Sequence, residues 1–251
     1  MHTALSLLLI LLCPLGMALM GAWAWAASKL GRVSVVAEAA VEEKVEHPLF
    51  ARFYLRLASG RGAKGEDDHR RRMLAGLSGR VIEVGAGNGL NFPVYSNSVE
   101  YVLAVEPEPL LREAAIKNAR GAPVRVEVVD GVSGRLPAED GSFDAGVASL
   151  VLCSVPDQAR ALAEFRRVIR PGGELRFYEH VVAHRPLTAG LQRAADAIFW
   201  PRVGGGCHLA RDTTRAIEEA GFRIESSERF AFTPGPPVPP LPHILGVARR
   251  P

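Results

Sequence analysis

Three glycines spaced two residues apart, Gly85, Gly87 and Gly89, follow a run of β-branched residues, and an acid, Glu83, lies just before them. Glycine lets the backbone adopt left-handed angles and approach a ligand closely, so this loop is suited to hold a nucleotide-like molecule where a buried parallel strand ends. The dinucleotide-binding fingerprint requires glycine at the sixth loop position, where this chain has Leu90. The loop therefore lacks the dinucleotide fingerprint but keeps the closely spaced glycines that let its backbone approach a ligand.

A second acid, Glu106, ends the next apolar strand, expected over 101–106, about twenty residues beyond the glycine loop. A carboxylate at this interval accepts hydrogen bonds from the two hydroxyls of a ribose. Taken alone, it is also compatible with capping a helix expected over 107–118. Loop and acid together predict a βαβ unit that binds an adenosine-containing cofactor, without distinguishing S-adenosylmethionine from a nicotinamide.

Strand and helix patterns alternate further along the chain. Apolar runs predict strands over 124–129, 145–151, 175–178 and 244–248, and a helix over 156–169 that stops at Pro171-Gly172-Gly173. This alternation predicts one α/β domain over 78–251 with a doubly wound, mostly parallel sheet.

Several stretches, in this order, resemble the class I S-adenosylmethionine-dependent methyltransferases: the glycine loop, Asp140-Gly-Ser-Phe-Asp144 and Pro171-Gly172-Gly173. Other stretches resemble a membrane-anchored methyltransferase-like family with members that methylate alkyl thiols. These are Ser149-Leu-Val-Leu-Cys-Ser-Val155, Tyr178-Glu-His-Val181, Gly206-Cys207 with Leu209-Ala-Arg-Asp212, and Pro242-His-Ile-Leu-Gly-Val-Ala248. The resemblance runs from Glu46 to the C-terminus and implies a Rossmann-like, seven-stranded sheet with helices on both faces and an antiparallel last strand.

The resemblance implies S-adenosyl-L-methionine as the cofactor, lying across the glycine loop with its ribose on Glu106. The residues it assigns to the cofactor are Glu83, Gly85, Ala86, Gly87, Gly89, Asn91, Glu106, Pro107, Asp130, Leu152 and Tyr54. Two of these have alternatives: Asp130 contacts the adenine amino group or only ends its strand, and Tyr54, with Phe53, covers the cofactor or packs in the core.

A methyl group on a sulfonium is already activated, so its transfer depends mainly on placing a nucleophile in line with it. His180, expected at the carboxyl edge of the sheet, is the candidate base or substrate-orienting group; the alternative is a histidine satisfied by local backbone. The implied acceptor is a small lipophilic molecule, with a thiol sulfur favoured and C- or O-methylation of a quinone or phenol as the alternative.

Two functions of other kinds are weighed against this one. A nicotinamide-dependent oxidoreductase is disfavoured by Leu90 and by the lack of a Tyr-x-x-x-Lys pair. A non-catalytic, membrane-tethered cofactor-binding module is disfavoured because the glycine loop and Glu106 are intact.

The three cysteines, Cys13, Cys153 and Cys207, form no Cys-x-x-Cys motif and have no companion pair of histidines. We therefore expect no metal site and no structural disulfide, as in a reducing compartment. Cys207 either packs in the core or, by the family resemblance, faces the substrate.

The formal net charge of the 251 residues is only +3, which does not indicate a nucleic-acid partner. The basic run Arg70-Arg-Arg72 follows three acids and is interpreted as a solvated helix face. A small-molecule acceptor is the expected partner, and the sequence indicates no oligomeric state.

Residues 4–27 contain no ionised side chain and are long enough to cross a membrane as a helix. Lys29 and Arg32 follow, which favours a cytoplasmic location for the rest of the chain. We expect an anchor over 1–28, a helical linker and lid over 29–77, and a cytoplasmic catalytic domain. The alternatives are a signal peptide cleaved near Ala26, although the usual positive n-region is missing, and a true start at Met17 or Met20, which would give a cytoplasmic protein.

Overall fold

The computed structural model describes residues 47–58, 66–233 and 240–251. These residues belong to a compact unit over Glu43–Pro251. The expected membrane anchor at 4–27 lies outside the described residues, as does about half of the expected linker. None of the helices in the described ranges is both long and apolar enough to span a membrane.

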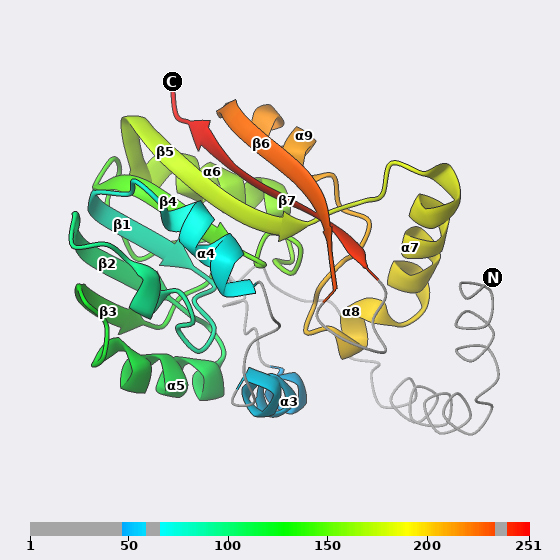
Figure 1. Cartoon of the computed structure of the whole chain (residues 1–251), viewed down its shortest axis with the longest axis horizontal. Helices are drawn as coiled ribbons and strands as arrows, with labels where there is room; N and C mark the ends of the chain where they lie inside the picture. The colour runs from blue at the N-terminus through cyan, green and yellow to red at the C-terminus, as the bar shows by residue number, and fades with distance from the viewer. Residues whose placement is uncertain (1–46, 59–65, 234–239) are drawn as a thin grey trace, which may run out of the picture. The chain divides into compact units, whose positions relative to one another are not determined.

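Seven strands form one sheet in the order β3-β2-β1-β4-β5-β7-β6 (Figure 1). Their bounds are β1 Gly79–Val84, β2 Val99–Val105, β3 Arg125–Val129, β4 Phe143–Ser149, β5 Ile169–His180, β6 Arg223–Phe232 and β7 Leu241–Arg249. Strands β1 to β5 are mutually parallel, and β7 runs antiparallel to both of its neighbours. The predicted mostly parallel sheet with an antiparallel last strand is confirmed.

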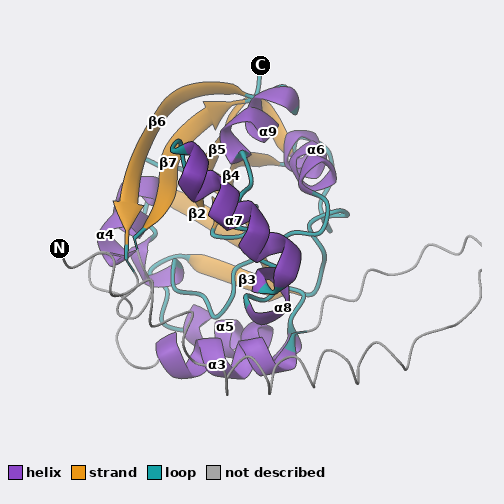
Figure 2. Cartoon of the chain, turned by 90° about the vertical axis from the view of Figure 1, so that its right-hand side faces the viewer, coloured by secondary structure: helices purple, strands orange, loops and turns teal. Residues whose placement is uncertain are grey.

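Helices cover both faces of the sheet. The described helices are α3 Pro48–Ala58, α4 Glu66–Leu74, α5 Pro109–Ala119, α6 Gln158–Val168, α7 Pro186–Ile198, α8 Trp200–Val203 and α9 Thr213–Glu219, with a 3-10 turn η1 at Phe92–Val94. Helices α6 and α9 pack together, α4 contacts β5 and β7, and α3 lies beside α5 (Figure 2). Asp157 caps α6 by accepting a hydrogen bond from the backbone N–H of Arg160.

Alternation of side chains along β1 divides the apolar core into two parts. Ile82 and Val84 pack in the part that contains α6 and α9, whereas Val81 packs in the part that contains α4. Glu83 points to the same side as Val81 and is buried, so β1 delivers a carboxylate into an apolar layer. A buried carboxylate requires hydrogen-bond partners, and side chains of the segment after the glycine loop supply them.

Strand β5 starts earlier than predicted. Helix α6 ends at Val168 and the extended backbone begins at Ile169, which pairs with Phe143 of β4. Gly172 has a φ of 75°, and the pairing with β4 shifts register in this region. The Pro-Gly-Gly segment, expected only to stop the helix, is therefore part of the strand.

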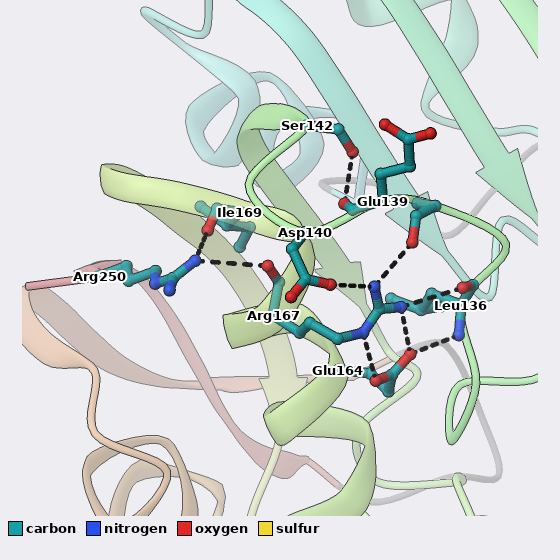
Figure 3. A network of polar contacts seen from close by, with 9 residues as sticks. Leu136, Glu139, Asp140, Ser142, Glu164, Arg167, Ile169 and Arg250 are labelled. Atoms are coloured by element: carbon teal, nitrogen blue, oxygen red, sulfur yellow. Dashed lines mark hydrogen bonds and ion pairs between the residues drawn. The ribbon is translucent and has the colours of Figure 1, made fainter.

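A polar network fixes the loop between β3 and β4 to α6 (Figure 3). The guanidinium of Arg167 donates to both carboxylate oxygens of Glu164 at 2.7 Å, to Asp140 at 2.8 Å and to the carbonyl of Leu136 at 3.1 Å. The Glu164 carboxylate also accepts from the backbone N–H of Leu136 at 2.7 Å. These bonds hold the loop whose first residues line the pocket at the end of the sheet.

Candidate active site

A pocket of about 470 Å³ lies where the parallel strands end. One part of it, here called the β1–β2 half, is lined by Gly85, Ala86, Gly87, Glu106, Pro107 and Val132. The other, the β4–β5 half, is lined by Cys153, His180, Trp200, Cys207, Leu241 and His243. The position agrees with the rule that open α/β sheets bind ligands at the carboxyl ends of their strands.

The glycine loop leaves β1 through left-handed backbone angles, with φ of 68° at Gly85 and 58° at Gly87. A Cβ on Gly85 would lie 2.3 Å from the side chain of Val151, so the loop passes too close to the β4 connection for any larger residue. Gly89, with φ of 82°, does not line the pocket, and a Cβ there would lie 2.4 Å from the ring of Phe92. Gly85 and Gly87 thus face the ligand space, while Gly89 shapes the loop.

Glu106 closes the β1–β2 half from the end of β2. Its carboxylate accepts from the backbone N–H of Gly87 at 2.7 Å and from that of Glu108 at 3.0 Å. Burial raises the pKa of Glu106, although these two bonds act in the opposite direction. Backbone N–H groups that follow β1 and β2 therefore orient this carboxylate, which lines the pocket.

Glu83 lies beneath the glycine loop and is 2% exposed. It accepts from the Asn91 side-chain amide at 2.8 Å and from the Tyr95 hydroxyl at 2.7 Å. Burial raises the pKa of Glu83 to about 7, which those two bonds only partly offset. Glu83 therefore holds the segment after the loop in place.

Arg70 contradicts the interpretation of 70–72 as a solvated run. Arg71 and Arg72 are exposed, but Arg70 is only 5% exposed. Its guanidinium donates to Asn91 at 3.0 Å, Ser149 at 3.2 Å and Glu66 at 3.0 Å. Because α4 turns this one side chain toward the pocket, Arg70 connects the end of β4 with the glycine-loop segment.

Glu179 plays a role that sequence reasoning missed. Its fully buried carboxylate, at the end of β5, accepts the backbone N–H groups of Val151, Leu152 and Cys153 at 2.9, 2.8 and 3.2 Å. Burial raises its pKa, against these three bonds. The only sign of this role in the sequence was an acid next to the predicted His180. The residues that Glu179 binds lie more than twenty positions away in the sequence.

His180 reaches the pocket as predicted and meets both described cysteines there. Its Nε2 is 2.7 Å from Sγ of Cys207, and Cys153 lies in the same cluster. The pKa of the Cys207 thiol is raised by the neighbouring Cys153 and by burial. Both cysteines are free, and Cys207 lines the pocket, as the resemblance implied.

Of the other predicted residues, Tyr54, Ala86, Asn91 and Pro107 line the pocket. The aromatic partner of Tyr54 is Phe50, at 5.9 Å between ring centroids, and not Phe53, which is 61% exposed. Residues four apart share a helix face, whereas adjacent residues do not.

Asp130 and Leu152 do not line the pocket. Asp130 is exposed and pairs with Arg112 at 3.0 Å, which supports its strand-ending role and not the adenine role. Leu152 is buried in the core, because the loop after β4 turns its neighbours Val151 and Cys153 toward the pocket instead.

The β1–β2 half has groups that fit the adenosine part of S-adenosylmethionine. Gly87 has no side chain to fill the space beneath Tyr54, and the oriented Glu106 carboxylate offers acceptors for ribose hydroxyls. Val132 and Ser133, two and three residues after Asp130, line the pocket.

Replacing Glu106 with alanine should weaken the binding of S-adenosylhomocysteine by at least about 10-fold, because charge-assisted hydrogen bonds are lost and two backbone N–H groups lose their acceptor. Isothermal titration calorimetry on the full-length protein measures this. The control is Glu100→Ala, at the exposed opposite end of β2. A dissociation constant within about twofold of wild type in a folded Glu106→Ala variant would contradict the ribose assignment.

Glu83 should make stability depend on pH. Its pKa is about 7 in the folded protein against an ordinary value of 4.5, so the folded state binds the proton more tightly than the unfolded state. The free energy of unfolding of the wild type should therefore fall, relative to that of Glu83→Gln, by about 3 kcal/mol between roughly pH 4.5 and 7. Chemical denaturation across that window, with Glu100→Gln as control, measures the difference; a difference independent of pH would exclude this effect.

Comparison with known proteins identifies the family. A methyltransferase-domain family model matches residues 82–177. Thiol S-methyltransferase TMT1B of Mus musculus is 34% identical over 210 residues, covering 78% of this chain and 84% of the mouse protein. The Homo sapiens protein of that name is 37% identical over 184 residues, covering 70% and 73%.

Among solved structures, an S-adenosylmethionine-dependent methyltransferase from Mesorhizobium loti has the same fold, with a TM-score of 0.55 at 24% identity, covering 74% of this chain and 98% of that one. The fold, the position of the pocket and the sequence similarity all indicate the same family. The chain is a class I S-adenosylmethionine-dependent methyltransferase and belongs to the thiol S-methyltransferase family.

Proposed function

We propose that this enzyme transfers the methyl group of S-adenosylmethionine to the sulfur of a small lipophilic thiol. The relatives named above are thiol S-methyltransferases, and their similarity extends over most of both chains. The observation in the structure that carries the proposal is the chemistry of the β4–β5 half of the pocket, which offers apolar surface, thiols and imidazoles.

Apolar residues suit this half of the pocket to a lipophilic acceptor. Phe50, Val155, Trp200, Phe232 and Leu241 line the pocket together with the sulfur atoms of the two cysteines. A pocket of mainly apolar walls with few polar groups is typical of small-molecule sites. The acceptor would reach the methyl donor with its sulfur toward the centre of the pocket and its hydrocarbon part against these side chains.

Carboxylates that could serve as a strong base are already engaged. Among the described residues that line the pocket, Glu66 accepts from Arg70, Glu83 from Asn91 and Tyr95, Glu106 from Gly87 and Glu108, and Glu108 from the backbone of His47. A carbon or phenol nucleophile benefits from a free base, whereas a thiol is intrinsically very nucleophilic through the small fraction of thiolate present near neutral pH. This difference favours sulfur over a quinone or phenol acceptor.

His180 is assigned to the acceptor, as base or as orienting group. It ends β5 in the β4–β5 half, and its Nε2 lies in the same cluster as two sulfur atoms. In the transfer, the thiol proton leaves, a sulfur lone pair forms the new bond to the methyl carbon, and the carbon–sulfonium bond breaks with its electron pair on the departing thioether. The protein's part is to position the sulfur and exclude water.

Full-length enzyme with labelled methyl donor should methylate alkyl thiols with a kcat/KM at least about 10-fold higher than for quinones or phenols of similar size. Mass spectrometry of the products locates the new methyl group on sulfur, carbon or oxygen. Glu106→Ala should lose most of this activity, while Glu100→Ala keeps it. Methylation of rings alone would replace this proposal by the quinone or phenol alternative, and no methylation of any class would favour a non-catalytic module.

We further propose that residues 4–27 hold the enzyme at a membrane, with the catalytic unit in the cytoplasm. The support is the uncharged length of that segment and the cations at Lys29 and Arg32. Large apolar side chains are also exposed along three helices, α3, α7 and α8, including Leu49, Phe53, Leu187, Leu191, Ile198 and Val203.

Cells expressing the full-length protein should retain it in the membrane pellet after extraction with alkaline carbonate. Deletion of residues 4–27 should release it to the supernatant, because the segment supplies most of the apolar length needed for insertion. A reporter fused after the C-terminus should be digested by protease added to the cytoplasmic side. Release of the full-length protein by carbonate would contradict the anchor, and a protected reporter would contradict the cytoplasmic orientation.

A further inference from the structure

Three ligand-type side chains converge in the β4–β5 half of the pocket from separate parts of the chain. Cys153 follows β4, His180 ends β5, and Cys207 lies between α8 and α9. One ligand atom from each, two sulfurs and one imidazole nitrogen, lie within 4.8 Å of one another, and all three residues are buried. The sequence spacing led us to expect no metal site, since no two of these residues share a motif.

Two thiolates and one imidazole form a ligand set typical of catalytic zinc. Structural zinc sites use four protein ligands, whereas catalytic sites use three and leave the fourth position to water or substrate. Bonds of about 2.3 Å to sulfur and 2.0 Å to nitrogen keep tetrahedral ligand atoms roughly 3.5 to 3.8 Å apart. In the observed cluster, Nε2 of His180 lies 2.7 Å from Sγ of Cys207, and the three ligand atoms all lie within 4.8 Å of one another. Shifts of about 1 Å bring them to the tetrahedral spacing.

We propose that Cys153, His180 and Cys207 bind a zinc ion whose open fourth position takes the sulfur of the acceptor. The metal site stands on the cluster itself, and its role with the acceptor rests on the thiol methyltransferase function proposed above. His180 then serves as a metal ligand that orients the substrate, and not as a base.

The surrounding structure holds the ligands at fixed positions. Glu179 accepts the backbone N–H of Cys153, and the carbonyl of Cys153 accepts the backbone N–H of His208 at 2.8 Å. The indole N–H of Trp200 donates to Sγ of Cys207 at 3.4 Å. Hydrogen bonds of this kind around metal ligands orient them and tune the ion. These bonds position Cys153 and Cys207 at the wall of the pocket, facing His180.

The charges of such a site suit thiol methylation. Zinc with two cysteine thiolates and a neutral imidazole has no net charge. When an acceptor thiol binds, its proton leaves to solvent and a sulfur lone pair fills the fourth position, which gives the complex one negative charge. That charge faces the positive sulfonium across a pocket of low polarity, where opposite charges attract strongly. The ion thereby keeps the acceptor as a thiolate at neutral pH.

Cobalt(II) replaces zinc in sites of this kind and reports its ligands by absorption. Full-length enzyme, reduced and freed of metal, should bind one cobalt ion per chain with the visible bands of a tetrahedral site and near-ultraviolet thiolate-to-cobalt bands. Cys207→Ser and His180→Asn should weaken cobalt binding by at least about 100-fold. His184→Asn, which changes an exposed histidine that does not line the pocket, should bind cobalt like the wild type.

Calorimetry with S-adenosylhomocysteine confirms that each variant is folded, since the β1–β2 half contains none of the three ligands. Addition of an alkyl thiol to the cobalt enzyme should shift the thiolate bands, and removal of metal should lower thiol methylation at least about 10-fold, with recovery on adding zinc. A folded wild-type enzyme without thiolate-to-cobalt bands, or a metal-free enzyme with full activity, would overturn the site. Cobalt binding without methylation of any thiol would support the site and overturn the function proposed above.

Discussion

Three buried carboxylates at the ends of parallel strands are the constraint on which the active site depends. Where a strand ends, its loop leaves the sheet and the backbone N–H groups of that loop lose their partners, which is unfavourable in a buried position. Glu106 accepts the N–H groups of Gly87 and Glu108, and Glu179 accepts those of three consecutive residues after β4. Glu83 accepts hydrogen bonds from two side chains that follow the glycine loop. The loops at this edge are thus fixed by ionisable groups whose pKa values are raised by burial.

This use of carboxylates determines what chemistry remains for the pocket. An acid that already accepts two or three hydrogen bonds is a poor general base, and the other pocket carboxylates are engaged in the same way. Sulfur and imidazole are left in the β4–β5 half, while the β1–β2 half keeps an oriented acid and an open glycine backbone. Arg70 connects the two halves through Asn91 and Ser149, so that movement of either half would affect both. The fold supplies the position of the pocket, and these side chains determine its function.

Much of this site is encoded in short stretches of sequence. The β-branched run and the spaced glycines specify a strand, a turn and a close backbone approach within about ten residues, so local sterics are enough to predict them. Glu106 and His180 were predicted because each ends a strand, and parallel strands bring their ends to one edge of the sheet. The seven-stranded, mostly parallel sheet with its antiparallel last strand followed from family resemblance and agrees with the structure, which adds the order of the strands.

Other features depended on packing between distant segments and could not be read from local patterns. Arg70 belongs to a charged run, and only the contact of α4 with the sheet buries it beside Asn91. Phe50, and not Phe53, accompanies Tyr54 because of the side of α3 that faces the pocket. Cys153, His180 and Cys207 share no motif, yet the loop after β4, the end of β5 and the loop after α8 bring them together. The sequence by itself determined most of the strands, the cofactor loop and its acids, because backbone sterics and strand ends act over short distances. Only the tertiary structure decided which side chains from remote segments meet, because that depends on how the segments pack.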